Sequence, residues 1–370
     1  MDAKLQELCR QAHEDRIRVG MLDTDTKNRT LELAADALMA HEQEILEANA
    51  IDMERGRERN MPQGLLDRLK LDHDRLLGMA DGLRQVAKLE DPIGEVMSMR
   101  KRPNGLIIGK VRVAIGVVGI IFEARPNVTS DAFGLCFKSG NCAILKGGSD
   151  AIHSNIAIVS AMQEALRRMN IPKGALSLIE STDRETTNAF MKMKDYVDLL
   201  IPRGGRGLIQ SVVNNATIPV IETGTGNCHV YVDQFADQEM AVNIIKNAKT
   251  QRIGVCNACE SLLVHDSMKE VLLPVLAERL REKHVEMRAD QEALSLMPGA
   301  VPASQEDWGT EYLDYILSIK TVYSVEEAIA HINRYNTGHS EAIITNNYMH
   351  AQKFLDEVDA AAVYVNASTR

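Results

Sequence analysis

The chain has 370 residues, a net charge of −10 and a hydrophobic content of 45%, which fits a globular protein with room for two or more domains. The negative charge argues against a general binder of nucleic-acid phosphates. Six cysteines in so long a chain do not make a disulfide framework, and the sequence shows no signal-peptide core and no apolar run of membrane length. We therefore expect a cytoplasmic protein.

Apolar residues at helical spacing predict helices over much of the first ninety residues, with a charged loop at 52–60. From Glu95 the pattern changes, and two strand-like runs flank Asn104-Gly105, which is a hairpin signal. Because this hairpin precedes a new domain, we expect it to be an arm that reaches another subunit.

Strands alternate with helices after residue 115. In the first half, the expected strands are 116–122, 142–146, 176–179, 197–201 and 218–221, and the expected helices include 131–138 and 151–169. In the second half, the expected strands are 261–264, 316–322, 342–345 and 362–365, and the expected helices are 238–250, 269–282, 325–334 and 349–358. This alternation predicts parallel sheets covered on both faces and joined by right-handed crossovers.

The best candidate nucleophile is Cys256, in the string T-Q-R-I-G-V-C-N-A-C-E. The expected helix 238–250 precedes it and the expected strand 261–264 follows, so Cys256 lies in a connecting loop, where catalytic groups are often held. Gly254 allows a sharp turn just before it, and Asn257 offers an amide beside the sulfur. The cysteine can act as a thiolate if nearby charges or amides stabilise its anion. A buried cysteine that only packs is the alternative.

Cys256 and Cys259 also form a C-x-x-C pair. Such a pair supplies half of a zinc site or a thioredoxin-like redox motif. The sequence has no second C-x-x-C, and His265 alone would not complete four ligands. We therefore expect no metal site.

Glycines follow two of the expected strands, Gly147-Gly148 after Lys146 and Gly204-Gly205 after the strand that ends at Ile201. Glycine turns that open a helix expose N–H groups that suit phosphate. The G-x-G-x-x-G fingerprint is absent, so any dinucleotide site is not of the usual type. Glu222 ends another expected strand and also has glycines after it.

Taken together, these features resemble the aldehyde dehydrogenase superfamily. The resemblance is carried by a G-V-V-G strand, an Asn near a Pro, a strand ending in Lys, a glycine turn, a Glu segment, a loop cysteine, a late Glu and a V-N string near the end. Longer strings resemble the γ-glutamyl phosphate reductases within it: I-F-E-A-R-P-N-V-T, A-I-L-K-G-G, L-I-P-R-G-G, V-I-E-T-G-T-G-N-C-H and Q-R-I-G-V-C-N-A. The match covers essentially the whole chain.

The resemblance implies an α/β fold like that of aldehyde dehydrogenases. It has a doubly wound parallel-sheet cofactor domain, a second α/β catalytic domain and a β-hairpin oligomerisation arm. This assigns an NADP-binding domain to 1–228, with the hairpin at about 95–113, and a catalytic domain to 229–362. Residues 363–370 would return to the cofactor domain. Relatives continue beyond this point, so we expect that the sequence is truncated or that a tail is missing from it.

The resemblance also implies a reaction, the NADPH-dependent reduction of L-glutamyl 5-phosphate to L-glutamate 5-semialdehyde and phosphate through a cysteine thioester. This is the second step of proline biosynthesis from glutamate. Cys256 matches the nucleophile, and its N–H and the Asn127 amide are the expected oxyanion donors. Arg125 competes with Asn127 for the aligned position. The expected partners are the acyl-phosphate substrate, further copies of the chain in a homo-oligomer, and glutamate 5-kinase.

Other positions match cofactor contacts. Lys146 matches the lysine that holds the adenosine ribose of NADPH, and Gly204 and Gly205 match the turn that faces the cofactor phosphates. Glu311 matches the late glutamate on the nicotinamide ribose, although its string here is E-Y-L-D. Glu222 matches the general base of hydrolytic relatives, and because a reductase activates no water we expect a structural role for it. Arg125, Glu222 and Asn257 are candidates for contacts with the substrate or its surroundings.

Two other interpretations stay open. An oxidising aldehyde dehydrogenase would share the fold, and the phosphate dependence of the reverse reaction would distinguish it. A non-catalytic binding protein could use the C-x-x-C pair for a metal or a disulfide. Thiol labelling addresses that alternative, because one fast-reacting cysteine supports an enzyme.

Overall fold

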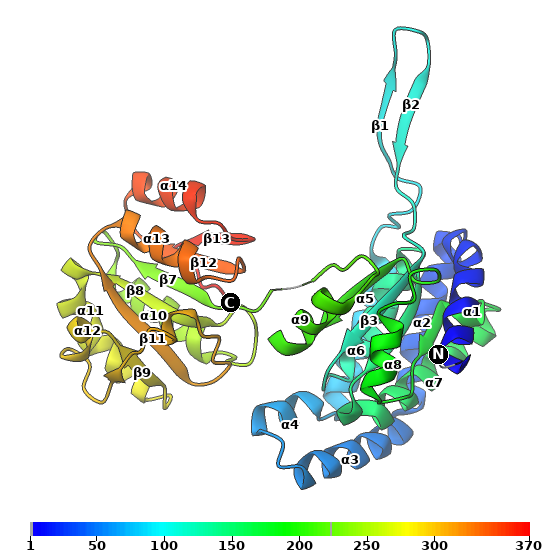
Figure 1. Cartoon of the computed structure of the whole chain (residues 1–370), viewed down its shortest axis with the longest axis horizontal. Helices are drawn as coiled ribbons and strands as arrows, with labels where there is room; N and C mark the ends of the chain where they lie inside the picture. The colour runs from blue at the N-terminus through cyan, green and yellow to red at the C-terminus, as the bar shows by residue number, and fades with distance from the viewer. Residues whose placement is uncertain (1–2, 223) are drawn as a thin grey trace. The chain divides into compact units, whose positions relative to one another are not determined.

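The computed structural model describes residues 3–222 and 224–370, apart from the side chains of Gln63 and Arg206. Met1 and Asp2, at the start of the charged N-terminal segment, and Thr223, in the V-I-E-T-G-T-G-N-C-H string, lie outside the described residues. The chain divides into two compact units, 1–223 and 224–370. Each unit has its own parallel sheet (Figure 1).

Helices open the first unit, as the spacing of apolar residues predicts. They are α1 (Ala3–Gly20), α2 (Thr24–Ala40), α3 (Glu42–Glu58), α4 (Gln63–Leu69) and α5 (His73–Lys88). The expected loop at 52–60 is wrong for most of its length, because α3 continues to Glu58. Asp52 is buried and accepts hydrogen bonds from the N–H and the hydroxyl of Ser154, at 2.8 and 2.7 Å. Its charge is therefore satisfied inside the fold and does not force a loop.

The sheet of the first unit has the order β5-β4-β3-β6, and all its pairs are parallel. Its strands are β3 (Val117–Phe122), β4 (Cys142–Gly147), β5 (Leu176–Leu178) and β6 (Leu199–Arg203). The chain moves outward from β3 to β5 and then returns to β6 on the other side of β3. In such sheets, ligands bind outside the carboxyl ends of the strands at this reversal.

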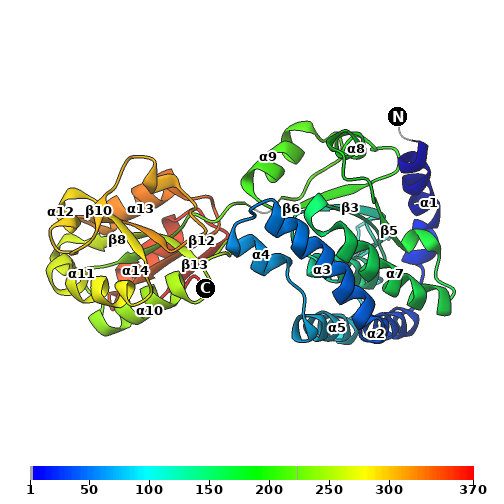
Figure 2. The same ribbon diagram turned by 90° about the horizontal axis from the view of Figure 1, so that it is seen from below.

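Helical segments alternate with these strands: α6 (Asn127–Lys138), η1 (Ser149–Ala151), α7 (Ile152–Arg168), η2 (Lys173–Ala175), α8 (Arg184–Phe190) and α9 (Arg206–Asn215). Figure 2 shows α7 running beside α3 over the sheet. Residues 218–221 were expected to form a strand, but they make only a single bridge, between Val220 and Leu200. Pro219 has no N–H to donate to a ladder, which limits pairing there.

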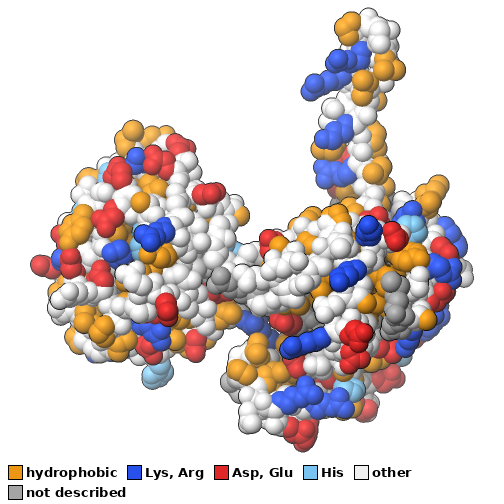
Figure 3. Space-filling view, viewed as in Figure 1, with side chains coloured by type: hydrophobic (Ala, Val, Ile, Leu, Met, Phe, Trp, Pro, Cys, Tyr) orange, Lys and Arg blue, Asp and Glu red, His pale blue; other side chains and the backbone are white. Residues whose placement is uncertain are grey.

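The expected hairpin is present as β1 (Val96–Lys101) and β2 (Ile107–Val111), which pair antiparallel. It extends away from the sheet of its own unit (Figure 1). Its apolar side chains are exposed, and they stand out beside basic ones in Figure 3. These exposed apolar residues are Val96, Met97, Met99, Leu106, Ile107, Ile108 and Val111. A contiguous apolar ribbon of this kind is typical of a surface that another chain covers.

The second unit has an all-parallel sheet in the order β10-β9-β11-β8-β7-β12-β13. Its strands are β7 (Cys228–Val232), β8 (Cys259–His265), β9 (Glu286–Ala289), β10 (Val301–Pro302), β11 (Ile316–Val322), β12 (Ser340–Ile344) and β13 (Ala362–Val365). Its helices are α10 (Gln238–Thr250), α11 (Asp266–Arg281), α12 (Gln291–Leu294), η3 (Asp307–Gly309), α13 (Val325–Tyr335) and α14 (Tyr348–Glu357). Because Ala362–Val365 pairs with β12, this strand belongs to the second unit. We had expected residues 363–370 to return to the first unit, and for this strand that expectation is wrong.

No helix in the described part of the chain is both long enough and apolar enough to cross a membrane.

Candidate active site

The surroundings of Cys256 are assembled by strand order. Strands β11, β8, β7 and β12 are neighbours and run parallel, so the segments that lead into them meet at one edge of the sheet. Cys256 lies just before β8, and His339 lies directly before β12. Gly226 precedes β7, and Glu311 precedes β11. The amino ends of four strands thus bring together residues that are far apart in the sequence.

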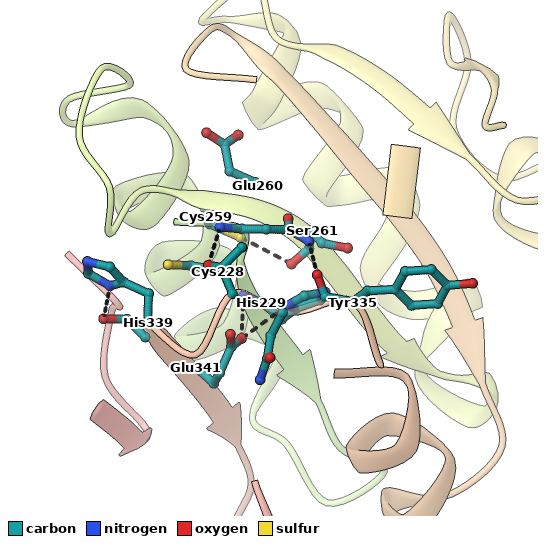
Figure 4. A network of polar contacts seen from close by, with 12 residues as sticks. Cys228, His229, Cys259, Glu260, Ser261, Tyr335, His339 and Glu341 are labelled. Carbon is teal, nitrogen blue, oxygen red and sulfur yellow. Dashed lines mark hydrogen bonds and ion pairs between the residues drawn. The ribbon is translucent and has the colours of Figure 1, made fainter. Parts of the chain in front are cut away.

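Cys256 is exposed, and His339 forms a side-chain hydrogen bond with it. This contact is the main cause that raises the pKa of His339, with help from the charges of Glu311 and Glu341. His339 Nδ1 also lies 2.8 Å from Ser340 Oγ, which holds the ring in place (Figure 4). A charged imidazole next to a thiol favours its thiolate form, so the pair has the composition of an activated nucleophile.

Close backbone contacts fix the position of the cysteine loop. A Cβ built on Gly226 would overlap the carbonyl oxygen of Cys256, so only glycine fits there. The N–H of Gly226 donates to Glu311 Oε1 at 2.8 Å, and Cys228 Sγ donates to the Cys256 carbonyl at 3.2 Å. Asn257 Oδ1 accepts from Arg370 Nη1 at 3.2 Å. The predicted residues Cys256, Asn257 and Glu311 therefore belong to one connected site.

A buried ion pair joins the two ends of the cysteine loop. Lys249 lies in the last turn of α10 and Glu260 lies in β8. Both side chains are fully buried, and Lys249 Nζ lies 2.5 Å from Glu260 Oε2. Glu260 Oε1 also accepts from the N–H of Leu313, at 3.1 Å. Leu313 has φ of 54°, a left-handed conformation that is strained for a leucine. Glu260 thus links the loop of Cys256 to the segment that carries Glu311.

A second polar cluster lies behind this edge (Figure 4). Glu341 Oε2 accepts from the N–H of His229 at 2.6 Å and lies 3.1 Å from its Nδ1, and both side chains are fully buried. The His229 ring meets that of His331 edge-on, with centroids 5.8 Å apart. Burial raises the pKa of Glu341 and lowers the pKa of His331 to about 3. The strands of this edge therefore enclose several ionisable groups.

The two cysteines of the C-x-x-C pair have different surroundings. Cys259 is buried in β8, and burial raises the pKa of its thiol to about 12, whereas Cys256 is exposed. Within the described ranges, no group of three or more histidine, cysteine or acidic side chains is arranged to hold a metal ion. The pair therefore offers one accessible sulfur.

In the first unit the predicted residues lie at or just after the carboxyl ends of strands. Lys146 is the last residue but one of β4 and is buried, and its Nζ donates to the carbonyl of Gly147 at 2.8 Å. Burial lowers the pKa of Lys146, and the charge of Asp183 opposes this effect.

Gly204 and Gly205 follow β6 and open α9. The N–H of Gly205 donates to Glu123 Oε2 at 3.0 Å, and a Cβ on Gly204 would lie 2.6 Å from the same oxygen. A carboxylate oxygen of the chain itself thus lies on the turn that was predicted to face cofactor phosphates. The turn is therefore able to bind an oxyanion.

Arg125 lies between β3 and α6, and Asn127 begins α6. Asn127 is exposed at the first position of the helix, and its Nδ2 donates to Asp131 Oδ2 at 3.0 Å. Arg125 is half-buried and follows Ala124, whose φ of 34° is unusual for a residue with a side chain. Strained backbone of this kind occurs preferentially at functional sites. Glu222 is exposed at the end of the first unit.

The structure adds two residues that sequence reasoning missed, His339 and Glu123. A signal for His339 was present in the sequence. The polar string N-T-G-H precedes an expected strand, as the Cys256 loop does, and in a parallel sheet such segments meet at one edge. Glu123 precedes the Asn-Pro region at the end of an expected strand, but nothing local links it to Gly205.

Comparison with known proteins agrees with this architecture. The model of the aldehyde dehydrogenase family matches residues 2–314 and 297–370. The γ-glutamyl phosphate reductase of Agathobacter rectalis is 68% identical over 99% of this chain and 88% of its own length. That of Lachnospira eligens is 59% identical over 94% of this chain and 84% of its own. The crystal structure of γ-glutamyl phosphate reductase from Thermotoga maritima superposes with a TM-score of 0.95 at 49% identity, covering 99% of this chain and 88% of that one. The chain therefore belongs to the aldehyde dehydrogenase family and, within it, to the γ-glutamyl phosphate reductases.

Proposed function

We propose that the protein reduces L-glutamyl 5-phosphate to L-glutamate 5-semialdehyde and phosphate with NADPH, through a thioester on Cys256. The reaction belongs to proline biosynthesis from glutamate, and it is the reaction of the reductases that the chain matches over nearly its whole length. The observation that carries the chemistry is the hydrogen bond between the exposed Cys256 and His339.

Cys256 attacks the acyl carbon as a thiolate. The Sγ–C bond forms, the C–O bond to phosphate breaks, and phosphate leaves with the electron pair. His339, as an imidazolium, stabilises the thiolate before attack and again when the sulfur departs from the reduced carbon. The proton consumed in the net reaction ends on the released phosphate.

An oxyanion forms on the substrate oxygen in both halves of the reaction. We assign the N–H of Cys256 and the amide of Asn127 as its donors, since preorganised donors at this point contribute strongly to catalysis. The N–H of Cys256 lies in a loop that close contacts already fix in place. Asn127 Nδ2 has a second hydrogen besides the one that it gives to Asp131. Arg125 is the alternative donor.

The family implies a nicotinamide cofactor, and we propose NADPH. When bound, it supplies the hydride that reduces the acyl carbon. The glycine turn at 204–205 fits a phosphate, because Glu123 already places a carboxylate oxygen there and must yield its position. Lys146 would hold the adenosine ribose, and Glu311 the nicotinamide ribose. On this assignment, the first unit binds the cofactor and the second carries the nucleophile.

Glu222 does not need to act as a base in this reaction, since no water is activated. It is exposed, which is consistent with a structural or solvent-facing role. Glutamate 5-kinase is the proposed source of the labile acyl phosphate, and the β1–β2 hairpin is the proposed contact in a homo-oligomer. We propose the cytoplasm as the location, because a thiolate enzyme needs a reducing compartment.

The test is an assay of the reverse reaction, NADP⁺ reduction with glutamate 5-semialdehyde and inorganic phosphate. The proposal predicts turnover that disappears when phosphate is omitted. Turnover that is independent of phosphate would instead identify an oxidising aldehyde dehydrogenase. Iodoacetamide labelling followed by peptide mapping should find Cys256 as the fast-reacting thiol, which a structural C-x-x-C protein would not show.

A further inference from the structure

The first unit contains a cavity of about 670 Å³ between helices α5 and α6 and strands β3 and β6. Among the lining residues that the structure describes, only Asp131 and Arg203 carry charge, and the charges are of opposite sign. Most of the wall is apolar, from Leu83, Val86, Val128, Leu135 and Ile201. An apolar pocket with a few placed polar groups is the usual form of a small-molecule site.

Asp131 connects this cavity to the proposed oxyanion donor. It lies one helical turn after Asn127 and accepts a hydrogen bond from Asn127 Nδ2 at 3.0 Å. A carboxylate only accepts, so this contact fixes the NH₂ end of the amide toward Asp131 and leaves its second N–H for another acceptor. Asn127 therefore contacts a residue that lines the cavity, although it is not itself part of the lining.

The electrostatics of the cavity suit a molecule that carries both charges. Loss of solvent around Asp131 raises its pKa, and Asn127 and the charge of Arg203 act in the opposite direction. The Asp131 side chain remains exposed at the cavity wall, so a cation that enters the cavity can pair with its carboxylate. Arg203, at the end of β6, presents a planar donor group that matches a carboxylate.

We propose that this cavity binds the amino-acid end of L-glutamyl 5-phosphate, with Asp131 on the α-ammonium group and Arg203 on the α-carboxylate. The inference rests on the proposed function. Two methylene groups separate the α-carbon from the reacting carbonyl, and they contact the apolar wall while Asn127 donates to the carbonyl oxygen. An aldehyde that lacks either charged group forms one charged contact fewer in the cavity, so the site selects for the zwitterion.

The experiment uses the whole protein in the reverse reaction with three aldehydes. Glutamate 5-semialdehyde carries both groups, 5-oxopentanoate lacks the α-amino group, and 4-aminobutanal lacks the α-carboxylate. We expect Asp131→Asn to lower kcat/KM about 10- to 100-fold for both amino aldehydes and at most about threefold for 5-oxopentanoate. We expect Arg203→Met to lower kcat/KM similarly for the two aldehydes that carry a carboxylate. Its kcat/KM for 4-aminobutanal should stay unchanged. Each comparison is a ratio of kcat/KM values for two enzymes on the same substrate. Ring closure of an amino aldehyde lowers the open-chain concentration equally for both enzymes and therefore cancels from the ratio.

Matched controls come from α5, where Asp81 and Arg84 form an ion pair at 2.9 Å and do not line the cavity. Asp81→Asn and Arg84→Met make the same charge changes and should leave all three activities unchanged. Equal losses on every aldehyde would reduce Asp131 or Arg203 to a structural role and overturn the proposal. A loss in Arg203→Met that appears as a higher KM for phosphate with all three aldehydes would place Arg203 on the phosphate instead, which also overturns its assignment.

Two further measurements keep the outcomes distinct. If a variant fails to fold, the wild-type protein alone decides, because its kcat/KM, expressed per open-chain aldehyde, must be higher for glutamate 5-semialdehyde than for each truncated aldehyde by at least about tenfold. Equal kcat/KM values for the three aldehydes would overturn the inference and leave the reductase intact. A wild-type protein with no phosphate-dependent turnover of any of them would instead defeat the proposed function.

Discussion

The two parallel sheets present their candidate residues at opposite edges. In the first unit, Lys146 lies at the carboxyl end of β4, and Asn127 and the 204–205 turn follow the carboxyl ends of β3 and β6. In the second, Cys256 and His339 precede the amino ends of β8 and β12. The carboxyl edge offers glycine turns and backbone N–H groups, which bind anions without a buried charge.

The amino edge of the second sheet is built differently. Behind it lie fully buried ionisable pairs, Lys249 with Glu260 and His229 with Glu341. Groups of this kind hold a reactive side chain in place and set its charge, but they make the fold sensitive to pH and to the loss of a partner. Changes at the first edge should therefore appear mainly in binding. Changes at the second edge should appear in turnover, stability and pH dependence.

The largest effect should come from the nucleophile. We expect Cys256→Ala to lower kcat by about four to six orders of magnitude, because the covalent route is lost. Cys259→Ala is the matched control and should keep most of the activity, since its thiol is buried in β8. Steady-state kinetics measure kcat for both variants. Full activity in Cys256→Ala would contradict the mechanism.

Breaking the buried ion pair should cost the most stability. We expect Lys249→Met to lower the free energy of unfolding of the second unit by about 3–5 kcal/mol, because Glu260 then lies in the interior without its partner, and it must either stay charged there or take up a proton. Lys246→Met is the control. Lys246 lies on the same helix and pairs with Glu282 in a partly exposed position, so its loss should cost at most about 1 kcal/mol. Denaturant titration compares the two, and equal costs would contradict the distinction.

His339 should affect turnover by stabilising the thiolate of Cys256. We expect His339→Gln to lower kcat/KM roughly 100-fold, within the usual range for a proton-handling histidine. Because contact with Cys256 raises the pKa of His339, the imidazolium persists to higher pH than in a free histidine and favours the thiolate there. The rate of iodoacetamide labelling of Cys256 should therefore shift to higher pH in the variant. An unchanged labelling profile would show that the contact has no electrostatic role.

Acid should destabilise the second unit through His331. Burial lowers the pKa of His331 from 6.5 to about 3, so between these values the unfolded chain binds a proton that the folded chain does not. Stability from this residue is full above pH 6.5 and is lost as the pH falls toward 3, by about 2 kcal/mol at pH 5. The fall in unfolding free energy between pH 7 and pH 5 should be smaller in His331→Phe by this amount. Equal pH slopes in the two proteins would refute the assignment.

The smallest effect should come from a residue at the carboxyl edge of the first sheet. We expect Lys146→Ala to raise the KM for NADPH about tenfold and to change kcat at saturation at most about threefold, as for an interaction that contributes uniform binding. Lys173→Ala, at an exposed lysine of the same unit, should change neither value. A dominant loss in kcat with an unchanged cofactor KM would move Lys146 from binding to chemistry.

Much of the fold could be predicted because it depends on local patterns. Helix α10 and strands β11 and β13 coincide with the expected ranges 238–250, 316–322 and 362–365. Amphipathic spacing and short apolar runs carry this information. The pattern failed where tertiary contacts dominate, as at Asp52, whose charge indicated a loop and whose hydrogen bonds to Ser154 hold it inside a helix.

The site was predictable only in part, for a related reason. The loop position of Cys256 follows from the adjacent helix and strand, and the structure confirms it. His339 lies far from Cys256 in the sequence, and only the order β8-β7-β12 brings their loops to one edge. Local composition does not encode strand order, so the contact could not be predicted. The same holds for Glu123 and the N–H of Gly205.

The division of the chain at residues 223 and 224 has a consequence for synthesis on the ribosome. Each unit is one continuous stretch of sequence, and the strands described for each sheet come from within its own stretch. The four described strands of the first sheet can therefore pair while the second unit is still being translated, since domains generally fold as units in the order of their synthesis. Parallel sheets form slowly because their strands are distant in sequence. We expect a ribosome-bound chain released after residue 223 to resist protease already, before the loop of Cys256 has been made.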